Sequence, residues 1–167
     1  MNKFFVIFIF LFSLLFLKAN ALPYDFESLE AVKIIMQPLQ EISSANEIYE
    51  GQEVKFKVKK NVYCHNCLYI RKDTIVTARI ETIITRGMNG FPAEIIIDNF
   101  KIDGVRDSQL LGTYKEVGSN FALLVYPIKW ILTPIPFAGS LTNFILGGHA
   151  KIKTTDTIAI KFYPHWK

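Results

Sequence analysis

The sequence has few residues of the kinds that carry chemistry, with two cysteines and three histidines among 167 residues. A structural zinc site needs four ligands, and one cysteine pair with scattered histidines does not supply them. His65, His149 and His165 fall in no serine, cysteine or metal signature, and no spacing among the carboxylates singles out a pair. We therefore expect no metal, no cofactor and no enzymatic activity.

The first 21 residues have the layout of a secretory signal peptide. Lys3 gives a positive start, Phe4 to Leu17 is apolar apart from Ser13, and Ala19-Asn20-Ala21 is a small-x-small cleavage site. The apolar run is shorter than the ~20 residues that a membrane-spanning helix needs. This favours cleavage after Ala21 over a retained anchor, and it predicts an exported protein of the periplasm or outer envelope.

Little net charge remains after such a cleavage. Lys3 and Lys18 leave with residues 1–21, so that 17 basic side chains face 15 acidic ones. This near balance excludes the strong electrostatic attraction by which basic proteins bind nucleic acid. We expect no nucleic-acid partner, and the sequence leaves the oligomeric state open.

Residues 22–49 have no clear pattern, and we expect an arm or one short helix there, with Pro38 limiting any helix. From Glu50 onward the period is two. Val54, Phe56 and Val58 alternate with three lysines, as in a half-buried strand. The lysine row of Lys55, Lys57 and Lys59 permits two interpretations. The lysines either bind an anionic surface, such as lipid headgroups, or form a solvated face that discourages edge pairing, and the second is favoured.

The following segments also indicate strands. Thr74 to Arg86 is rich in β-branched residues, and we expect Val76, Ala78, Ile80 and Ile84 to share one face. Turn signals at Asn89-Gly90 and Asp103-Gly104 bound a second strand, and shorter strands are expected at residues 110–114, 121–126 and 149–163. Residues 50–167 are therefore predicted to form one all-β domain, a small, mainly antiparallel barrel or sandwich.

The cysteines lie in the stretch YCHNCLYI. In an exported chain two cysteines usually pair, and His65-Asn66 fits a two-residue hairpin loop because Asn tolerates the left-handed conformation. We expect a disulfide between Cys64 and Cys67 that pins a turn. The alternative is a thiol-disulfide exchange site, but such sites place the first cysteine at a helix N-terminus, and no helix is predicted after Cys67.

The most apolar internal segment runs from Phe121 to Gly148 and contains a single charge, Lys129. In the favoured interpretation, Phe121 to Tyr126 is a core strand, residues 130–137 are a buried connection, and Ser140 caps a short helix that ends at Leu146. In the other interpretation, an exposed apolar loop meets a membrane or a partner protein. Its contact residues would be Trp130, Ile131, Leu132 and Phe137.

The segment IRKDTIVTARIETIITRGMNGFPAEIIIDNFKIDG resembles a turn-and-strand pattern that recurs in uncharacterised exported bacterial β-domain proteins, and GGHAKIKTTDTIAIKFY is similar to their final hairpin. TARIETII, MNGFPAEIIIDNF and LLGTY also resemble the C-terminal β-barrel of TrbI-like type IV secretion channel proteins, over residues Tyr69 to Tyr114. The chain departs from that pattern because no proline-glycine step precedes Leu111. The resemblance implies a barrel and an envelope location, and it assigns no activity and no functional residue.

These observations predict a non-catalytic, exported envelope protein that binds or scaffolds an envelope protein or a membrane surface. The sequence leaves two alternatives. One is a periplasmic thiol-disulfide oxidoreductase that uses Cys64 and Cys67, and the other is a component of an envelope channel.

Overall fold

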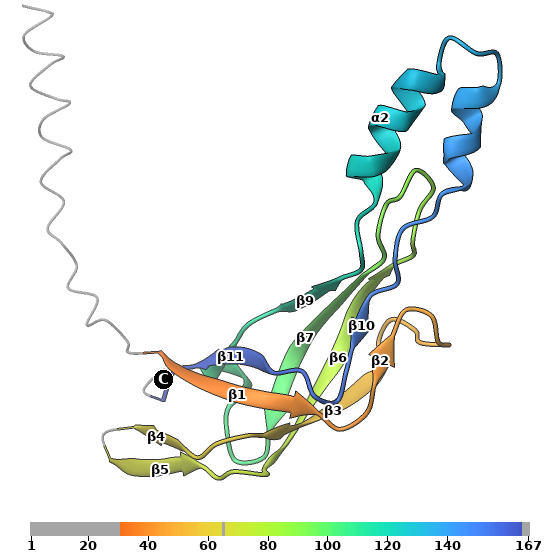
Figure 1. The fold of residues 1–167 in the computed structure, drawn as a ribbon. Coiled ribbons are helices and arrows are strands. Elements are labelled where there is room, and N and C mark those ends of the chain that lie inside the picture. Colours follow the sequence, from red (N-terminus) through yellow and green to blue (C-terminus); the bar gives the residue numbers. More distant parts are fainter. Residues whose placement is uncertain (1–30, 65, 165–167) are drawn as a thin grey trace, which may run out of the picture.

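A computed structural model describes residues 31–64 and 66–164, so the predicted signal peptide lies outside the described residues. The described chain is mostly β-structure with two helical segments near its C-terminal end (Figure 1). The elements in chain order are β1 (Val32–Pro38), β2 (Ile42–Ser43), β3 (Glu53–Val58), β4 (Val62–Cys64), β5 (Cys67–Ile70), β6 (Ile75–Ile84), β7 (Glu94–Ile102), the 3-10 turn η2 (Asp107–Gln109), β8 (Leu110–Leu111), β9 (Tyr114–Val117), α2 (Ala122–Leu132), the 3-10 helix η3 (Ala138–Phe144), β10 (Lys151–Ile152) and β11 (Ile158–Phe162).

Seven strands form one antiparallel sheet in the order β8-β11-β1-β3-β6-β7-β9, which curls into a half-barrel. The two outer strands, β8 and β9, are separated in the chain only by Gly112 and Thr113. One short run of chain therefore pairs with β11 at one margin of the sheet and with β7 at the other. The described chain is therefore mostly β with an antiparallel sheet, as predicted, although two helices are present and the sheet closes only into a half-barrel.

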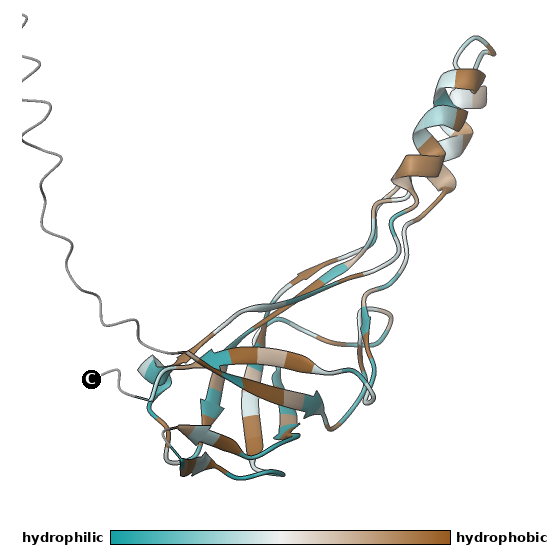
Figure 2. Ribbon diagram, turned by 60° about the vertical axis from the view of Figure 1, so that its left-hand side comes forward, coloured by the Kyte–Doolittle hydropathy of each residue, from teal (hydrophilic) through white to brown (hydrophobic). Residues whose placement is uncertain are grey.

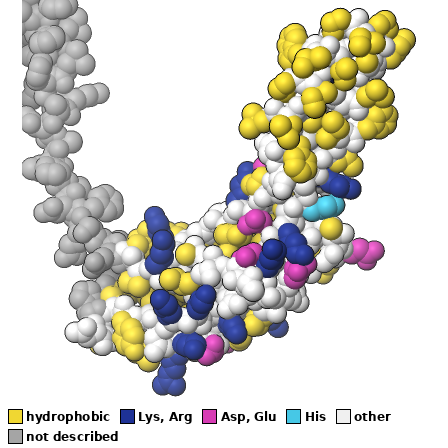
Figure 3. All heavy atoms as spheres, in the orientation of Figure 1, with side chains coloured by type: hydrophobic (Ala, Val, Ile, Leu, Met, Phe, Trp, Pro, Cys, Tyr) yellow, Lys and Arg dark blue, Asp and Glu magenta, His cyan; other side chains and the backbone are white. Residues whose placement is uncertain are grey.

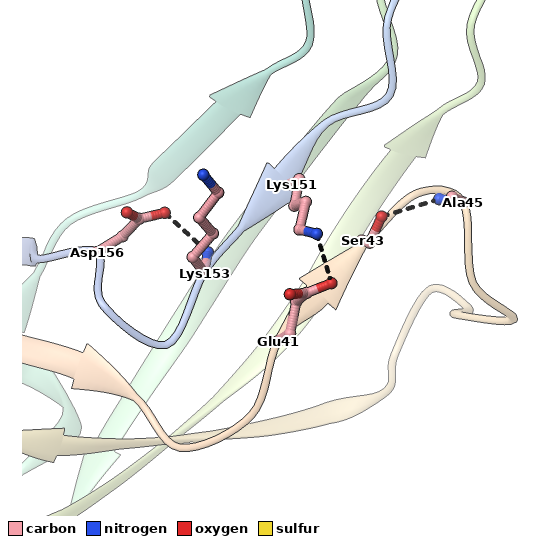
Figure 4. Close-up of polar contacts among 6 residues, drawn as sticks. All are labelled: Glu41, Ser43, Ala45, Lys151, Lys153 and Asp156. Atoms are coloured by element: carbon pink, nitrogen blue, oxygen red, sulfur yellow. Dashed lines mark hydrogen bonds and ion pairs between the residues drawn. The ribbon is translucent and has the colours of Figure 1, made fainter.

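Two strand pairs stand apart from the main sheet. In the pair of β2 and β10, Lys151 lies opposite Ser43 and its Nζ is 2.9 Å from Oε1 of Glu41 (Figure 4). Local hydrogen bonds hold the turns beside it, from the amide of Lys153 to Oδ2 of Asp156 and from the amide of Ala45 to Oγ of Ser43. The pair of β4 and β5 is the predicted hairpin around His65-Asn66.

The core lies on the inner face of the curled sheet, where the apolar residues of the period-two pattern meet. Phe56 and Phe162 are among the largest fully buried side chains, and the Phe56 ring lies 6.0 Å from that of Phe100. The ribbon coloured by hydropathy shows apolar and polar residues alternating along the strands (Figure 2). Burial of one such side chain stabilises the fold by about 1.5–3 kcal/mol. Because the alternation places these side chains on one face of each strand, their burial favours the assembly of the strands into the sheet.

Two bulges between β6 and β7 change which residues face inward. Asn99, with φ of 56°, lies at the first register shift, and Glu81 is the extra residue at the second. After the second bulge Ile83 packs against the core, whereas Ile84 is exposed. The expectation that Ile84 shares a face with Val76, Ala78 and Ile80 is therefore wrong, because one inserted residue reverses the alternation of side chains.

The described part of residues 22–49 differs from the predicted arm or short helix. Val32–Pro38 is strand β1, which lies inside the sheet between β11 and β3. Its inward residues Ile34, Met36 and Pro38 alternate with outward ones, a short period-two pattern that Pro38 obscured. The β domain thus includes residues well before position 50.

The predicted core strand at Phe121 to Tyr126 is wrong, because Phe121 is the N-cap of helix α2 and residues 122–126 form its first part. Helix η3 follows from Ala138 to Phe144 and contains Ser140, so Ser140 is not the N-cap that was expected. Among the described residues no helix is both long enough and apolar enough to cross a membrane. The two helices lie side by side and project away from the sheet, at the end opposite the described chain termini (Figure 1).

Candidate functional site: an apolar helical finger

Helices α2 and η3 with their connections, residues 119–147, form a projection that we call the finger. Large apolar side chains cover it, and the space-filling view shows them from its tip to its base, where charged side chains take over (Figure 3). The most exposed are Phe137 at 89%, Leu123 at 82%, Phe144 at 81%, Trp130 at 76% and Ile131 at 74%. In water-soluble proteins, large exposed apolar patches are typical of surfaces that meet membranes, ligands or other proteins.

The polarity of α2 is the reverse of that of a helix on a water-soluble domain. Its inward face carries the buried Ala122 and Val125 and the half-buried Lys129 and Leu132. The outward positions on α2 carry Leu123, Leu124, Tyr126, Ile128, Trp130 and Ile131, all exposed. The single charge of the finger is therefore turned inward while the apolar side chains face out, as in segments surrounded by lipid.

A short polar seam lies between the two helices. Lys129 Nζ is 3.5 Å from Oδ1 of Asn89, and the buried Thr142 hydroxyl lies 3.4 Å from the same oxygen. Thr142 Oγ1 also donates to the Gly139 carbonyl at 2.8 Å. A cleft of about 220 Å³ opens beside the seam and is lined in part by Lys129, Thr133, Ser140 and Asn143. Lys129 and Thr142 thus meet on Asn89, a residue outside the finger, while large apolar side chains of the finger face out.

Asn89 belongs to the loop between β6 and β7, residues 85–93, which we call the wedge loop. The next residue, Gly90, bonds the two chain segments at the base of the finger. Its amide donates to the Ile145 carbonyl, and its carbonyl accepts a hydrogen bond from the Phe121 amide. Gly147 approaches the same loop so closely that a Cβ there would lie 1.9 Å from the Phe91 carbonyl oxygen. The finger is therefore mounted on the sheet by backbone hydrogen bonds, which form its neck.

The four candidate contact residues all fall on the finger, although their exposure differs. Trp130, Ile131 and Phe137 are exposed, whereas Leu132 is half-buried on the inward face of α2. Sequence reasoning missed Leu123, Leu124, Leu141 and Phe144, and it missed Met88 on the wedge loop. For the four finger residues the signal was the long apolar run with one charge, which does not show which side chains face out; Met88 lies outside that run.

The cysteine hairpin is present, but the structure does not support the predicted disulfide. Cys64 and Cys67 are partners in register, and Asn66 has the predicted left-handed conformation with φ of 64°. The two cysteines are not bonded to each other and are not at disulfide distance. Cys64 is buried while Cys67 is exposed, and the register of the hairpin shifts between Val62 and Tyr63, so this hairpin is not the regular one that the disulfide requires.

A serine and a histidine meet where β2 and β10 lie side by side, but their contact does not have the form of a catalytic pair. Ser44 Oγ lies 3.2 Å from Nδ1 of His149, and it also accepts a hydrogen bond from the Ala150 amide at 3.0 Å. The contact joins the ends of the two strands, and no carboxylate of the described chain bonds the histidine ring. Nor do the described residues contain a group of three or more His, Cys, Asp or Glu that could hold a metal ion.

No protein-family model matches the sequence, and no curated protein and no solved structure is significantly similar to it.

Proposed function

We propose that this chain is an exported, non-catalytic protein of the cell envelope whose finger inserts into a lipid bilayer while the half-barrel remains in water. The observation that carries the proposal is the reversed polarity of the finger, with its one charge inward and its large apolar side chains outward. In water this arrangement leaves unburied several side chains that are each worth about 1.5–3 kcal/mol on burial. In lipid the same arrangement is favourable.

The direction of Lys129 supports insertion with the tip leading. Side chains of a helix tilt toward its N-terminus, which for α2 is at the neck. The Lys129 amine accordingly meets Asn89 of the wedge loop. A lysine at moderate depth that points its amine back toward the headgroups is the arrangement known for lysines near membrane surfaces.

The length of α2 sets the depth of insertion. Eleven residues at 1.5 Å each give about 16 Å, roughly half of the ~30 Å hydrocarbon core. The neck would then lie at the headgroups and the tip near the middle of the bilayer. The ion pair between Lys115 Nζ and Glu94 Oε2, 2.6 Å apart, belongs to the strands that lead to the neck and would stay in the aqueous phase.

A flotation assay tests the proposal, with phosphatidylcholine vesicles and the chain that begins at Leu22, so that the apolar leader does not contribute. The parent chain should float with the vesicles. Trp130→Ser with Phe137→Ser should weaken binding about a hundredfold or more, since two large aromatic contacts are lost. The matched control is Tyr49→Ser with Tyr63→Ser, which removes two exposed aromatics from the sheet domain and should leave flotation unchanged.

Depth is read from the same vesicles with brominated lipids, in a Trp166→Phe background that leaves Trp130 as the only tryptophan. Quenching of Trp130 fluorescence by bromines in the acyl chains supports insertion. A parent chain that does not float would contradict the proposal. If the Trp130 and Phe137 double variant instead loses its far-ultraviolet circular dichroism spectrum, the finger is part of the folding core and the proposal is wrong.

A further inference from the structure

Five lysines form a row on the outer face of the sheet, at the end away from the finger. Lys55, Lys57 and Lys59 alternate along β3 and just beyond it, and Lys33 on β1 lies directly opposite Lys161 on β11. The Lys59 amide donates a hydrogen bond to the Ile35 carbonyl, so these two residues lie opposite each other, just beyond β3 and on β1. Lys33, two residues before Ile35, therefore continues the row of Lys55, Lys57 and Lys59 beyond its end. At 3.3 Å per residue along a strand, the row is about 20 Å long.

The position of this basic row in the sheet argues against a purely structural role. Lysines on edge strands discourage aggregation, but β1 and β3 are interior strands. Like charges directly opposite each other, as at Lys33 and Lys161, destabilise an antiparallel pair. The strand face is solvated, as the interpretation favoured from sequence expects, but protection of an edge does not explain lysines on these interior strands.

The row is also uncompensated by acids. None of the five lysines takes part in an ion pair within the described part of the chain, and Lys59 Nζ bonds only the Thr157 hydroxyl. Acids near the row include Glu53, which is paired in register with Arg79, and Asp73 in the turn before β6. Asp156, next to Thr157, accepts a hydrogen bond from the Lys153 amide. Neighbouring lysines lie about 7 Å apart, within one Debye length of about 8 Å at physiological salt, so their potentials add.

The register places the row far from the membrane-inserting end. Ile84 pairs with Glu94 toward the neck, whereas Val76 pairs with Ile102 at the other end of β6 and β7. Lys57 lies opposite Ile75, so it belongs to that other end. Dark-blue side chains gather there, away from the yellow finger (Figure 3). A bilayer that holds the finger does not reach this face.

We propose that the basic row binds a linear, carboxylated polysaccharide of the cell envelope. A straight row of point charges fits a polymer of repeated anionic groups. The five residues of the row are all lysines, so the row itself offers point charges and not the arginine forks that are common in protein interfaces. The exposed Tyr63 and Tyr69 belong to the separate hairpin of β4 and β5. The choice of an envelope polymer rests on the proposed exported location, whereas the choice of a polyanion rests on the charges alone.

The test uses the chain that begins at Leu22 and polygalacturonate as the probe, with neutral dextran and a single-stranded oligothymidine as comparisons. Lys33→Gln, Lys57→Gln and Lys161→Gln together should weaken binding to polygalacturonate about tenfold or more at low salt. The slope of log affinity against log salt should fall by about 2, because roughly 0.7–0.9 counterions are released per neutralised charge.

The matched control removes the same number of positive charges from lysines outside the row. Lys101→Gln, Lys115→Gln and Lys151→Gln alter lysines that are ion-paired with Asp107, Glu94 and Glu41. Retained binding in this control, with loss in the first variant, supports the proposal. Equal loss in both would show that net charge alone acts, tighter binding to the oligothymidine would assign a different class of partner, and no binding by the parent chain would refute the row as a site. None of these outcomes depends on vesicle flotation, so failure here is distinguishable from failure of the finger.

Discussion

Gly90 occupies a tightly packed point of the neck. Its φ is +79°, and a Cβ there would lie 2.6 Å from the Phe121 carbonyl carbon and 2.7 Å from the Ala122 nitrogen. Gly51 has a similar φ of +86°, and a Cβ on Gly51 would have no neighbour within 4 Å, so Gly51 isolates the backbone effect. Gly51→Ala should cost about 1 kcal/mol of unfolding free energy for the left-handed conformation.

Gly90→Ala should cost about 2–4 kcal/mol, because overpacking against backbone adds to that conformational cost. Urea denaturation measures the difference between the two variants. Hydrogen exchange at the Phe121 amide, which donates to Gly90, should also accelerate in Gly90→Ala alone. Equal destabilisation by the two substitutions would mean that the neck yields to a methyl group and is not rigid.

Tyr114 is the residue whose ionisation the fold changes most clearly. Burial raises the pKa of its phenol, and the hydrogen bond that it donates to Glu116 Oε2 at 2.6 Å raises it further, as does the charge of Glu116. At pH values above about 10 the unfolded chain loses this proton while the folded chain keeps it. The stability that Tyr114 contributes is therefore complete below pH 10 and is lost as pH rises beyond it.

We expect the unfolding free energy of the parent chain to fall more steeply between pH 9 and pH 11 than that of Tyr114→Phe. Urea denaturation at the two pH values measures this slope. The matched control is Tyr49→Phe, which removes a phenol from an exposed position. If Tyr114→Phe kept the steep slope of the parent, the raised pKa would be contradicted.

The cysteine turn shows how far prediction reaches at the scale of single residues. The left-handed conformations of Asn66 and Asn89 were predictable because they depend on the residue type and its immediate turn. The disulfide was not, since it depends on the relative direction of two side chains in an irregular hairpin. A turn conformation follows from the residues in the turn, whereas the relative position of two side chains depends on the surrounding fold.

At the scale of elements, most strands with one apolar face were predictable, whereas β1 and helix α2 were not. The short helix expected from Ser140 to Leu146 corresponds in part to η3. β3 and β6 follow the period-two pattern of EVKFKV and IVTARI. In contrast, ALLVYPIKWIL is apolar on nearly every side, so periodicity does not distinguish a buried strand from a helix in an apolar surrounding. Pro127 is also unfavourable inside a helix, although the structure accommodates it in α2. The bulge at Glu81 was also not predictable, because no residue type at that position requires a bulge.

At the scale of the whole molecule, the order of the strands and the position of the finger depend on contacts between distant segments. β1 pairs with β11 from the other end of the chain, and the wedge loop joins Phe121 and Ile145 at the neck. The core cluster contains no residue of 122–144. The molecule therefore separates into a half-barrel that holds the fold and a finger that contributes little to its core.

This separation predicts the result of removing the finger. Phe121 and Ile145 both bond Gly90, so their backbones lie close together, and a short glycine-serine linker replacing residues 122–144 should span them without strain. The shortened chain, beginning at Leu22, should keep its β-sheet circular dichroism and lose less than about 1 kcal/mol of unfolding free energy, as surface changes usually do. It should also stop floating with phosphatidylcholine vesicles while it still binds polygalacturonate, because the basic row stays intact. A shortened chain that fails to fold would show that the finger supports the sheet, and one that still floats would place the membrane contact elsewhere on the half-barrel.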